Sequence, residues 1–223
     1  MRAGYGTAAL GRSLSKRERV RLVETAYDAG IRWFDTAPLY GGGAAEDALG
    51  LALRGKGDVT IVTKVGIMPP GLVGTGLRRA AVGGRFAPVD IRRQLERSLR
   101  RLGRDSVDVV LLHEVDARSA PTGLETLDLL REAGVLRLTG IGTGALPTEA
   151  ILESCVPDVV QLAAGDTVDT RGAALVLHSV LAGRTTEPAV ELLRDAASSH
   201  PQAIILVGSR NPEHIREAAA ALG

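Results

Sequence analysis

The stretch Gly30-Ile-Arg-Trp-Phe-Asp-Thr-Ala-Pro-Leu-Tyr-Gly41 holds the pattern that indicates the fold of this 223-residue chain. A glycine that ends a helical pattern is followed by a short strand-forming run, residues 32–36, and the run closes on polar residues. Glycine is favoured where a helix ends, and short runs rich in β-branched and aromatic residues are typical of strands. The same order of helix, strand and polar residue recurs along the chain, which predicts alternating β-strands and α-helices.

Eight short runs are expected to form strands, and most are continuous apolar stretches, as in strands buried on both faces. The expected strands span residues 5–10, 32–36, 59–64, 107–113, 138–142, 159–162, 174–181 and 203–207. Between them the apolar residues follow helical spacing, most clearly at Ile91, Leu95, Leu99 and Leu102. The expected helices span residues 16–29, 44–53, 89–102, 123–133, 147–153, 188–198 and 212–222.

This alternation predicts an α/β fold, a (β/α)8 TIM barrel, formed as a single domain by residues 1–223. The segment 163–173, between the sixth and seventh strands, is too short and too rich in glycine and threonine for more than a helical turn, so we expect a shortened sixth βα unit. A doubly wound open sheet is the competing fold. It usually carries a Gly-x-Gly-x-x-Gly fingerprint after its first strand, whereas here Gly4-x-Gly6 leads directly to Thr7.

Polar side chains lie at or soon after the ends of three successive predicted strands: Asp35 and Tyr40, then Lys64, then His113. Because the carboxyl ends of parallel barrel strands open onto one face, we expect these four side chains to lie together. An acid, a phenol, an amine and an imidazole can supply the proton and the charge that carbonyl reduction needs. Each of them alone also fits a structural role, such as a helix cap or a lysine that reaches water.

Composition narrows the possible partners. The net charge is +1, the charged residues are spread along the chain and aromatic residues make up 3%, which argues against nucleic-acid binding. No apolar run approaches the roughly 20 residues of a membrane span, the N-terminus has no signal-peptide core, and the single Cys155 cannot form an intrachain disulfide. We therefore expect a cytoplasmic monomer or small homo-oligomer that acts on a small molecule, without a metal, because its four histidines form no closely spaced pair.

The stretch quoted above, with Glu46 after it, resembles the aldo-keto reductases. Lys64 in Val-Thr-Lys, His113 after two leucines, the run Ser-Leu-Arg-Arg-Leu at 98–102 and the tail Val-Gly-Ser-Arg-Asn-Pro-Glu-His-Ile-Arg-Glu at 207–217 do so as well. The resemblance extends over nearly the whole chain. It implies a (β/α)8 barrel that binds NADPH across its C-terminal face and interconverts a carbonyl and an alcohol by hydride transfer.

The resemblance also implies a role for each strand-end residue. Tyr40 is expected to donate the proton, and a nearby ammonium group, that of Lys64, is expected to lower the pKa of this phenol. Asp35 is expected to pair with Lys64 and fix its position. His113 is expected to donate a hydrogen bond to the substrate oxygen and orient it.

The resemblance implies a cofactor site that departs from the family in places. Gln161 matches the glutamine that holds the nicotinamide carboxamide, and Thr143 lies where the family commonly has a Ser-Asn pair. His178 replaces the usual tyrosine that stacks on the nicotinamide. Arg210, always charged and beside a helix N-terminus, is suited to the 2′-phosphate that separates NADP from NAD. The remaining expected contacts are Ser179, Leu181 and Gly183 at the pyrophosphate, Ser209 at the 2′-phosphate and His214 near the adenine.

Two further functions remain open on the same barrel. One is a redox-silent binding or regulatory module. The departures from the family's cofactor-binding residues favour this function. The other is an enzyme that uses the same acids and bases without hydride transfer, in an elimination, cyclisation or epimerisation. In every case we expect an open pocket, because the loop at 183–187 is short and the sequence ends soon after the last helix, with residues 67–86 as its main movable wall.

Overall fold

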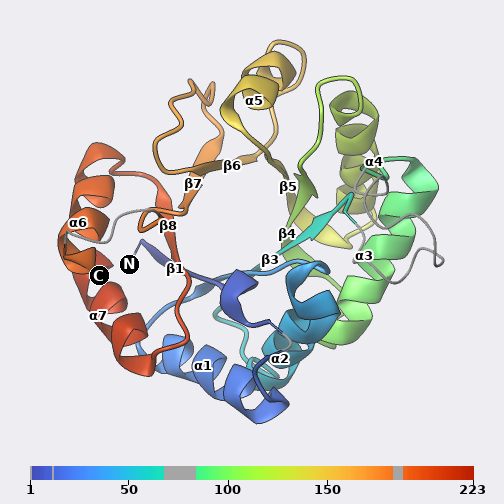
Figure 1. Ribbon diagram of the computed structural model, residues 1–223. Helices are drawn as coiled ribbons and strands as arrows, with labels where there is room; N and C mark the ends of the chain where they lie inside the picture. Colours follow the sequence, from blue (N-terminus) through green and yellow to red (C-terminus); the bar gives the residue numbers. More distant parts are fainter. Residues whose placement is uncertain (1, 12, 68–83, 183–187) are drawn as a thin grey trace.

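The computed structural model describes residues 2–11, 13–67, 84–182 and 188–223. Eight parallel strands pair in sequence order and close into a barrel, because β8 returns to pair with β1 (Figure 1). The strands are β1 (Ala3–Gly6), β2 (Trp33–Asp35), β3 (Thr60–Val65), β4 (Val107–His113), β5 (Leu136–Gly142), β6 (Val159–Ala163), β7 (Ala174–His178) and β8 (Ile204–Val207). The predicted barrel is confirmed.

Helices form the outer ring of the barrel (Figure 1). The described residues contain α1 (Lys16–Asp28), α2 (Ala44–Ala52), α3 (Pro88–Leu102), α4 (Ala120–Glu132), α5 (Ala145–Leu152), α6 (Ala189–Ser199) and α7 (Pro212–Leu222). Residues 164–173, all of them described, join β6 to β7 without a helix. The sixth βα unit is therefore shortened, as expected.

Two strands, β1 and β7, end three or more residues earlier than predicted. After β1, residues Thr7–Ala9 form a 3₁₀ turn, η1, closed by the bond from Leu10 N to the Thr7 carbonyl oxygen at 2.9 Å, and the Thr7 hydroxyl donates to the carbonyl oxygen of Asp35 at 2.9 Å. After β7, Ser179 has a φ of 61°. A left-handed conformation ends a strand, so the predicted extensions to Leu10 and Leu181 are wrong.

Strand side chains alternate between two apolar cores. One core lies between the strands and the helices and includes Phe34. The other fills the inside of the barrel with Val62, Val109, Leu111, Val159, Val176 and Leu206. Gly140 leaves the space that this packing needs, since a Cβ there would lie 2.4 Å from Leu111 Cδ2. The interior is thus closed by apolar side chains below the carboxyl ends of the strands.

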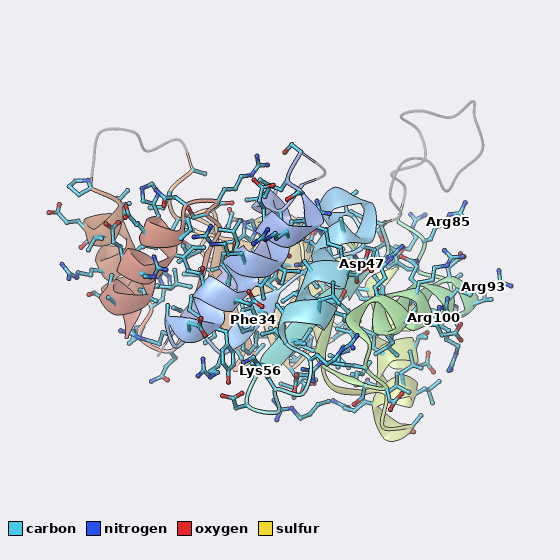
Figure 2. The ribbon with its side chains drawn as sticks, turned by 90° about the horizontal axis from the view of Figure 1, so that it is seen from below. Phe34, Asp47, Lys56, Arg85, Arg93 and Arg100 are labelled. Carbon is cyan, nitrogen blue, oxygen red and sulfur yellow. The ribbon has the colours of Figure 1, made fainter. Side chains whose placement is uncertain are left out.

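Helix α3 shows how the helical spacing divides the side chains between core and solvent. Ile91, Leu95 and Leu102 are buried against the barrel. Arg93 and Arg100 lie on the opposite, solvent-exposed side of the helix (Figure 2). The helix ends at Gly103, whose φ of 63° closes it in the left-handed conformation that glycine adopts without strain.

Candidate active site

The ammonium group of Lys64 is the centre of a buried polar cluster at the carboxyl ends of β2 and β3. Lys64 is 1% exposed, and its Nζ donates to Asp35 Oδ1 at 2.6 Å, to the Thr36 carbonyl oxygen at 3.1 Å and to Tyr40 Oη at 3.3 Å. An ammonium group has three N–H donors, so each of them has an acceptor. The structure thus places three of the four strand-end residues in direct contact.

Strand register explains the meeting of Asp35 and Lys64. Asp35 at the end of β2 lies opposite Val62 of β3. Lys64 follows Val62 by two residues, so both side chains point to the same face of the sheet, which is the barrel interior. An interior ammonium beside an interior carboxylate therefore follows from the pairing of these two strands.

Tyr40 begins a tight turn, η2 (Tyr40–Gly43), that depends on glycine. Gly41, Gly42 and Gly43 have φ angles of 61°, 68° and 97°, a conformation that glycine adopts without the strain of a Cβ. A Cβ at Gly43 would lie 2.5 Å from Arg101 Cζ, so the guanidinium of Arg101 packs directly against this turn.

An ion pair with a buried carboxylate and a partly exposed guanidinium lies beside this turn. Glu46 of α2 is 0% exposed, and its two carboxylate oxygens accept from Thr63 Oγ1 at 2.8 Å and from Arg101 Nη1 at 2.9 Å. Thr63 precedes Lys64 in β3, so the pair joins α2, α3 and the strand that carries the ammonium group. No local pattern indicates this contact, although Glu46 belongs to the stretch that resembles the family.

Asp35 has a second partner from the opposite side of the barrel. Gln161 of β6 donates from Nε2 to Asp35 Oδ2 at 2.8 Å, and both residues are buried. The two oxygens of the carboxylate therefore have different donors, Lys64 and Gln161. The sequence predicted Gln161 at the site but not this contact.

Tyr40 and His113 face a common cavity of about 400 Å³. Their rings lie edge to face with centroids 6.4 Å apart. The cavity is also lined by Asp35 and by the exposed Glu114, which has a φ of 52°. All four strand-end residues therefore gather at one face of the barrel, with three of their side chains on the cavity wall and Lys64 behind them.

Burial governs the protonation of the cluster. It raises the pKa of Tyr40, and the attraction of Lys64 for the phenolate offsets this only in part. Lys64 thus acts to lower this pKa, as expected, but the net pKa lies above its ordinary value because desolvation outweighs the ammonium charge. Burial and the charge of Lys64 lower the pKa of His113 to about 3, so its imidazole is neutral at physiological pH.

Lys64 itself remains charged. Burial acts to lower its pKa, but Asp35 and Tyr40 raise it by more, and the net pKa lies above its ordinary value. A buried ammonium group at this position is held in its charged form by the carboxylate beside it.

The expected cofactor residues divide into two groups. Gln161, His178, Ser179 and Leu181 line the same cavity as Tyr40. The imidazole Nδ1 of His178 lies 2.8 Å from Ser179 Oγ, and burial lowers the pKa of His178. Thr143 is buried at the end of β5 but is absent from the described cavity wall.

The second group lies beside the cavity, around the start of α7. Arg210 donates from Nε to the Ala9 carbonyl oxygen at 2.6 Å and from Nη1 to Ser13 Oγ at 3.3 Å. The carbonyl oxygen of Ser209 accepts from the buried Tyr5 hydroxyl at 2.9 Å. His214 is exposed on α7. Gly183 lies outside the described residues, as do residues 68–83 of the expected loop wall.

Two further properties concern the described residues alone. They contain no group of three or more His, Cys, Asp or Glu side chains placed to hold a metal ion. None of the helices they form is long and apolar enough to cross a membrane.

Known proteins share both the sequence pattern and the fold. A family model described as the aldo/keto reductase family matches residues 2–163. A D-threo-aldose 1-dehydrogenase of a Pseudomonas species is 35% identical over 164 residues, which cover 63% of this chain and 49% of that protein. The chain spans about half the length of the curated relatives it matches.

Solved structures match over almost the whole chain. A protein of Pseudomonas aeruginosa described as an aldo-keto reductase has a TM-score of 0.79 and 27% identity, over 99% of this chain and 91% of that one. An aldo/keto reductase of Klebsiella pneumoniae in complex with NADP and acetate has a TM-score of 0.72 over 99% of this chain and 85% of that one. At 22% identity, this second likeness shows the fold alone.

Proposed function

Because this chain belongs to the aldo/keto reductase family, we propose that it is an NADP-dependent oxidoreductase that interconverts a carbonyl compound and an alcohol by hydride transfer. The observation that carries the proposal is the contact of the buried Lys64 ammonium with both Asp35 and Tyr40, at the wall of a cavity that His113 also lines. An oxidoreductase of this family needs a proton donor and a charge beside it, and this cluster supplies both.

The cavity fits the nicotinamide end of the cofactor. Its volume of about 400 Å³ lies within the range of small-molecule sites. Gly6, Gly142 and Gly208 line it without side chains, and a Cβ at Gly208 would lie 3.3 Å from the Gly6 carbonyl oxygen. The glycines thus keep the carboxyl ends of β1, β5 and β8 open to a flat ring.

Particular residues would hold the cofactor along this opening. Gln161 and Thr143 would contact the carboxamide, and His178 would stack on the ring. Arg210 and the N-terminus of α7 would favour a 2′-phosphate, because a guanidinium and free backbone N–H groups attract phosphate. Ser179 and Leu181 would lie along the pyrophosphate, Ser209 at the 2′-phosphate and His214 near the adenine.

When bound, NADPH supplies the hydride, and the residues of the chain handle the proton. Burial keeps the Tyr40 phenol protonated at physiological pH. Its O–H can therefore donate to the carbonyl oxygen as negative charge develops there. The Lys64 ammonium then stabilises the phenolate, and Asp35 keeps that ammonium charged and in place. Alcohol oxidation reverses these steps, with the phenolate as the proton acceptor.

His113 would orient the reacting oxygen. Its imidazole is neutral, so it carries one N–H and can donate a hydrogen bond to a carbonyl oxygen beside Tyr40. A donor that is already fixed in a partly dry cavity stabilises the developing alkoxide without reorganisation.

The proposal is tested by titrating the chain with NADPH and following cofactor fluorescence, then measuring absorbance at the reduced-nicotinamide band with a panel of aldehydes. The panel should include aldoses, because a D-threo-aldose 1-dehydrogenase is similar to this chain. We expect NADPH to bind and at least one carbonyl compound to accelerate its oxidation. No binding at about millimolar NADPH, which corresponds to about 4 kcal/mol, would contradict the proposal.

A further inference from the structure

The two oxygens of the Asp35 carboxylate are bound from opposite sides of the barrel. Oδ1 accepts from Lys64 of β3 at 2.6 Å, and Oδ2 accepts from Nε2 of Gln161 at 2.8 Å. Strand β6, which carries Gln161, lies opposite β2 in the closed barrel, with three strands between them in either direction. The amide therefore reaches across the interior to a group that is itself 2% exposed.

The chemistry of this contact fixes the orientation of the amide. An ionised carboxylate only accepts hydrogen bonds, so Gln161 must present its NH₂ group to Asp35. Its Oε1 then lies toward Gly142, where a Cβ would be 3.2 Å away. A side chain at position 142 would crowd the amide, and glycine leaves the space that this orientation needs.

Asp35 in turn determines where the ammonium group lies. Among the three contacts of Lys64 Nζ, the one to Asp35 is the shortest and the one to Tyr40 is the longest. A displacement or a change in charge of the carboxylate would therefore alter the Lys64–Tyr40 contact first. Gln161 is in a position to act on Tyr40 through these two intervening groups.

We propose that Gln161 is a positioning residue for the proton donor: by donating to Asp35 it holds the carboxylate, and through Lys64 it sets the geometry and charge around Tyr40. This role rests on the proposed function. It is additional to a contact of Gln161 Oε1 with the cofactor, because the two roles use opposite ends of the amide.

Two variants separate the roles. Gln161→Met keeps the length of the side chain and removes both the Nε2 donor to Asp35 and the Oε1 acceptor, so kcat should fall by about tenfold or more, while the NADPH Kd should rise only by the several-fold of about one lost hydrogen bond. In Gln161→Glu, two carboxyl groups meet across the barrel and share one proton. When the new glutamic acid is protonated it can donate to Asp35 as the amide does, so this variant should retain activity at about pH 5.5. It should lose activity by about pH 8, where both carboxyl groups are ionised.

A matched control comes from Gln94, a second buried glutamine, which among the described residues accepts from Gly66 N and donates to the Arg85 carbonyl oxygen, both of them backbone groups. Gln94→Met should lower thermal stability and keep the wild-type pH profile. A purely structural role for Gln161 predicts this same behaviour for its own variants.

The pH profile of Gln161→Glu decides the question. A profile equal to that of the wild type, or a Gln161→Met variant that loses NADPH affinity with kcat unchanged, would overturn the positioning role and leave the proposed function intact. A wild-type chain that binds NADPH and reduces no carbonyl compound would overturn both.

Discussion

The ammonium group of Lys64 lies 3.3 Å from the hydroxyl oxygen of Tyr40 at the carboxyl ends of the barrel strands, where Lys64 is buried and Tyr40 is half-buried on the cavity wall. Lys64 keeps its positive charge because Asp35 raises its pKa, and Tyr40 keeps its proton because burial raises its pKa by more than Lys64 lowers it. A neutral phenol beside a charged amine can release a proton to a carbonyl oxygen and be stabilised afterwards.

Arg210 should determine the choice between the two nicotinamide cofactors. Its guanidinium is held against the carbonyl oxygen of Ala9, beside the start of α7. Charge-assisted hydrogen bonds contribute about 1.5 to 3 kcal/mol, so Arg210→Ala should weaken NADPH binding by at least about tenfold and leave NADH binding unchanged. Fluorescence titration with both cofactors measures this.

Arg216→Ala is the matched control, since Arg216 is exposed on α7, the helix that begins just after Arg210. It should leave both affinities near those of the wild type. Equal NADPH and NADH affinities in the wild type, unaltered by Arg210→Ala, would refute the assignment of the 2′-phosphate site.

Glu46 should contribute strongly to stability. Its carboxylate is fully buried, and Arg101 is its counter-ion at 2.9 Å. Glu46→Ala removes the acceptor of the hydrogen bonds from Thr63 and from Arg101, whose side chain is 24% exposed, so it should lower the free energy of unfolding by about 2 kcal/mol in urea denaturation. The double variant Glu46→Ala/Arg101→Met should recover part of this loss. If the urea midpoint of Glu46→Ala equalled that of the wild type, the ion pair would make no net contribution to stability.

Acid should destabilise the chain partly through His113. The pKa of this imidazole is about 3 in the folded chain, against an ordinary value near 6.5 when unfolded. The unfolded state therefore binds a proton first, and stability is lost as the pH falls from about 6.5 toward 3. This loss should be on the order of 1.5 kcal/mol by about pH 5.

His113→Asn removes that contribution, so its free energy of unfolding should change less between about pH 7 and pH 5 than that of the wild type. Urea denaturation of the two proteins at both pH values makes the comparison. If the free energy of unfolding fell equally in the two proteins between the two pH values, His113 would have to bind its proton equally well in the folded and the unfolded chain.

Local sequence patterns predicted the barrel and predicted that the polar residues at the ends of its strands lie together. Alternating apolar runs and helical spacing fix the order of the elements, and parallel closure then brings Asp35 and Lys64 to one face. The Thr7–Ala9 turn was missed because residues 7–9 carry no glycine, proline or other turn signal, and the turn is defined only by the backbone hydrogen bond from Leu10 N to the Thr7 carbonyl oxygen.

Contacts between distant segments could not be predicted in this way. Arg101 is 55 residues from Glu46, and Gln161 is 126 residues from Asp35, so no local spacing indicates either pair. The net direction of the Tyr40 pKa shift could not be predicted for a related reason. It depends on how much water the folded chain removes from the phenol, which the sequence around Tyr40 does not indicate.

The kinetic comparison of Tyr40→Phe with the wild type tests the central proposal most directly. The substitution removes only the hydroxyl group, so it should lower kcat by at least about a hundredfold, as expected for loss of a general acid, while NADPH affinity stays within about twofold. Both are measured on one preparation, by cofactor fluorescence and by absorbance at the reduced-nicotinamide band with the best carbonyl substrate of the wild type. Wild-type turnover by Tyr40→Phe, with NADPH bound normally, would show that the proton comes from another group and would contradict the account.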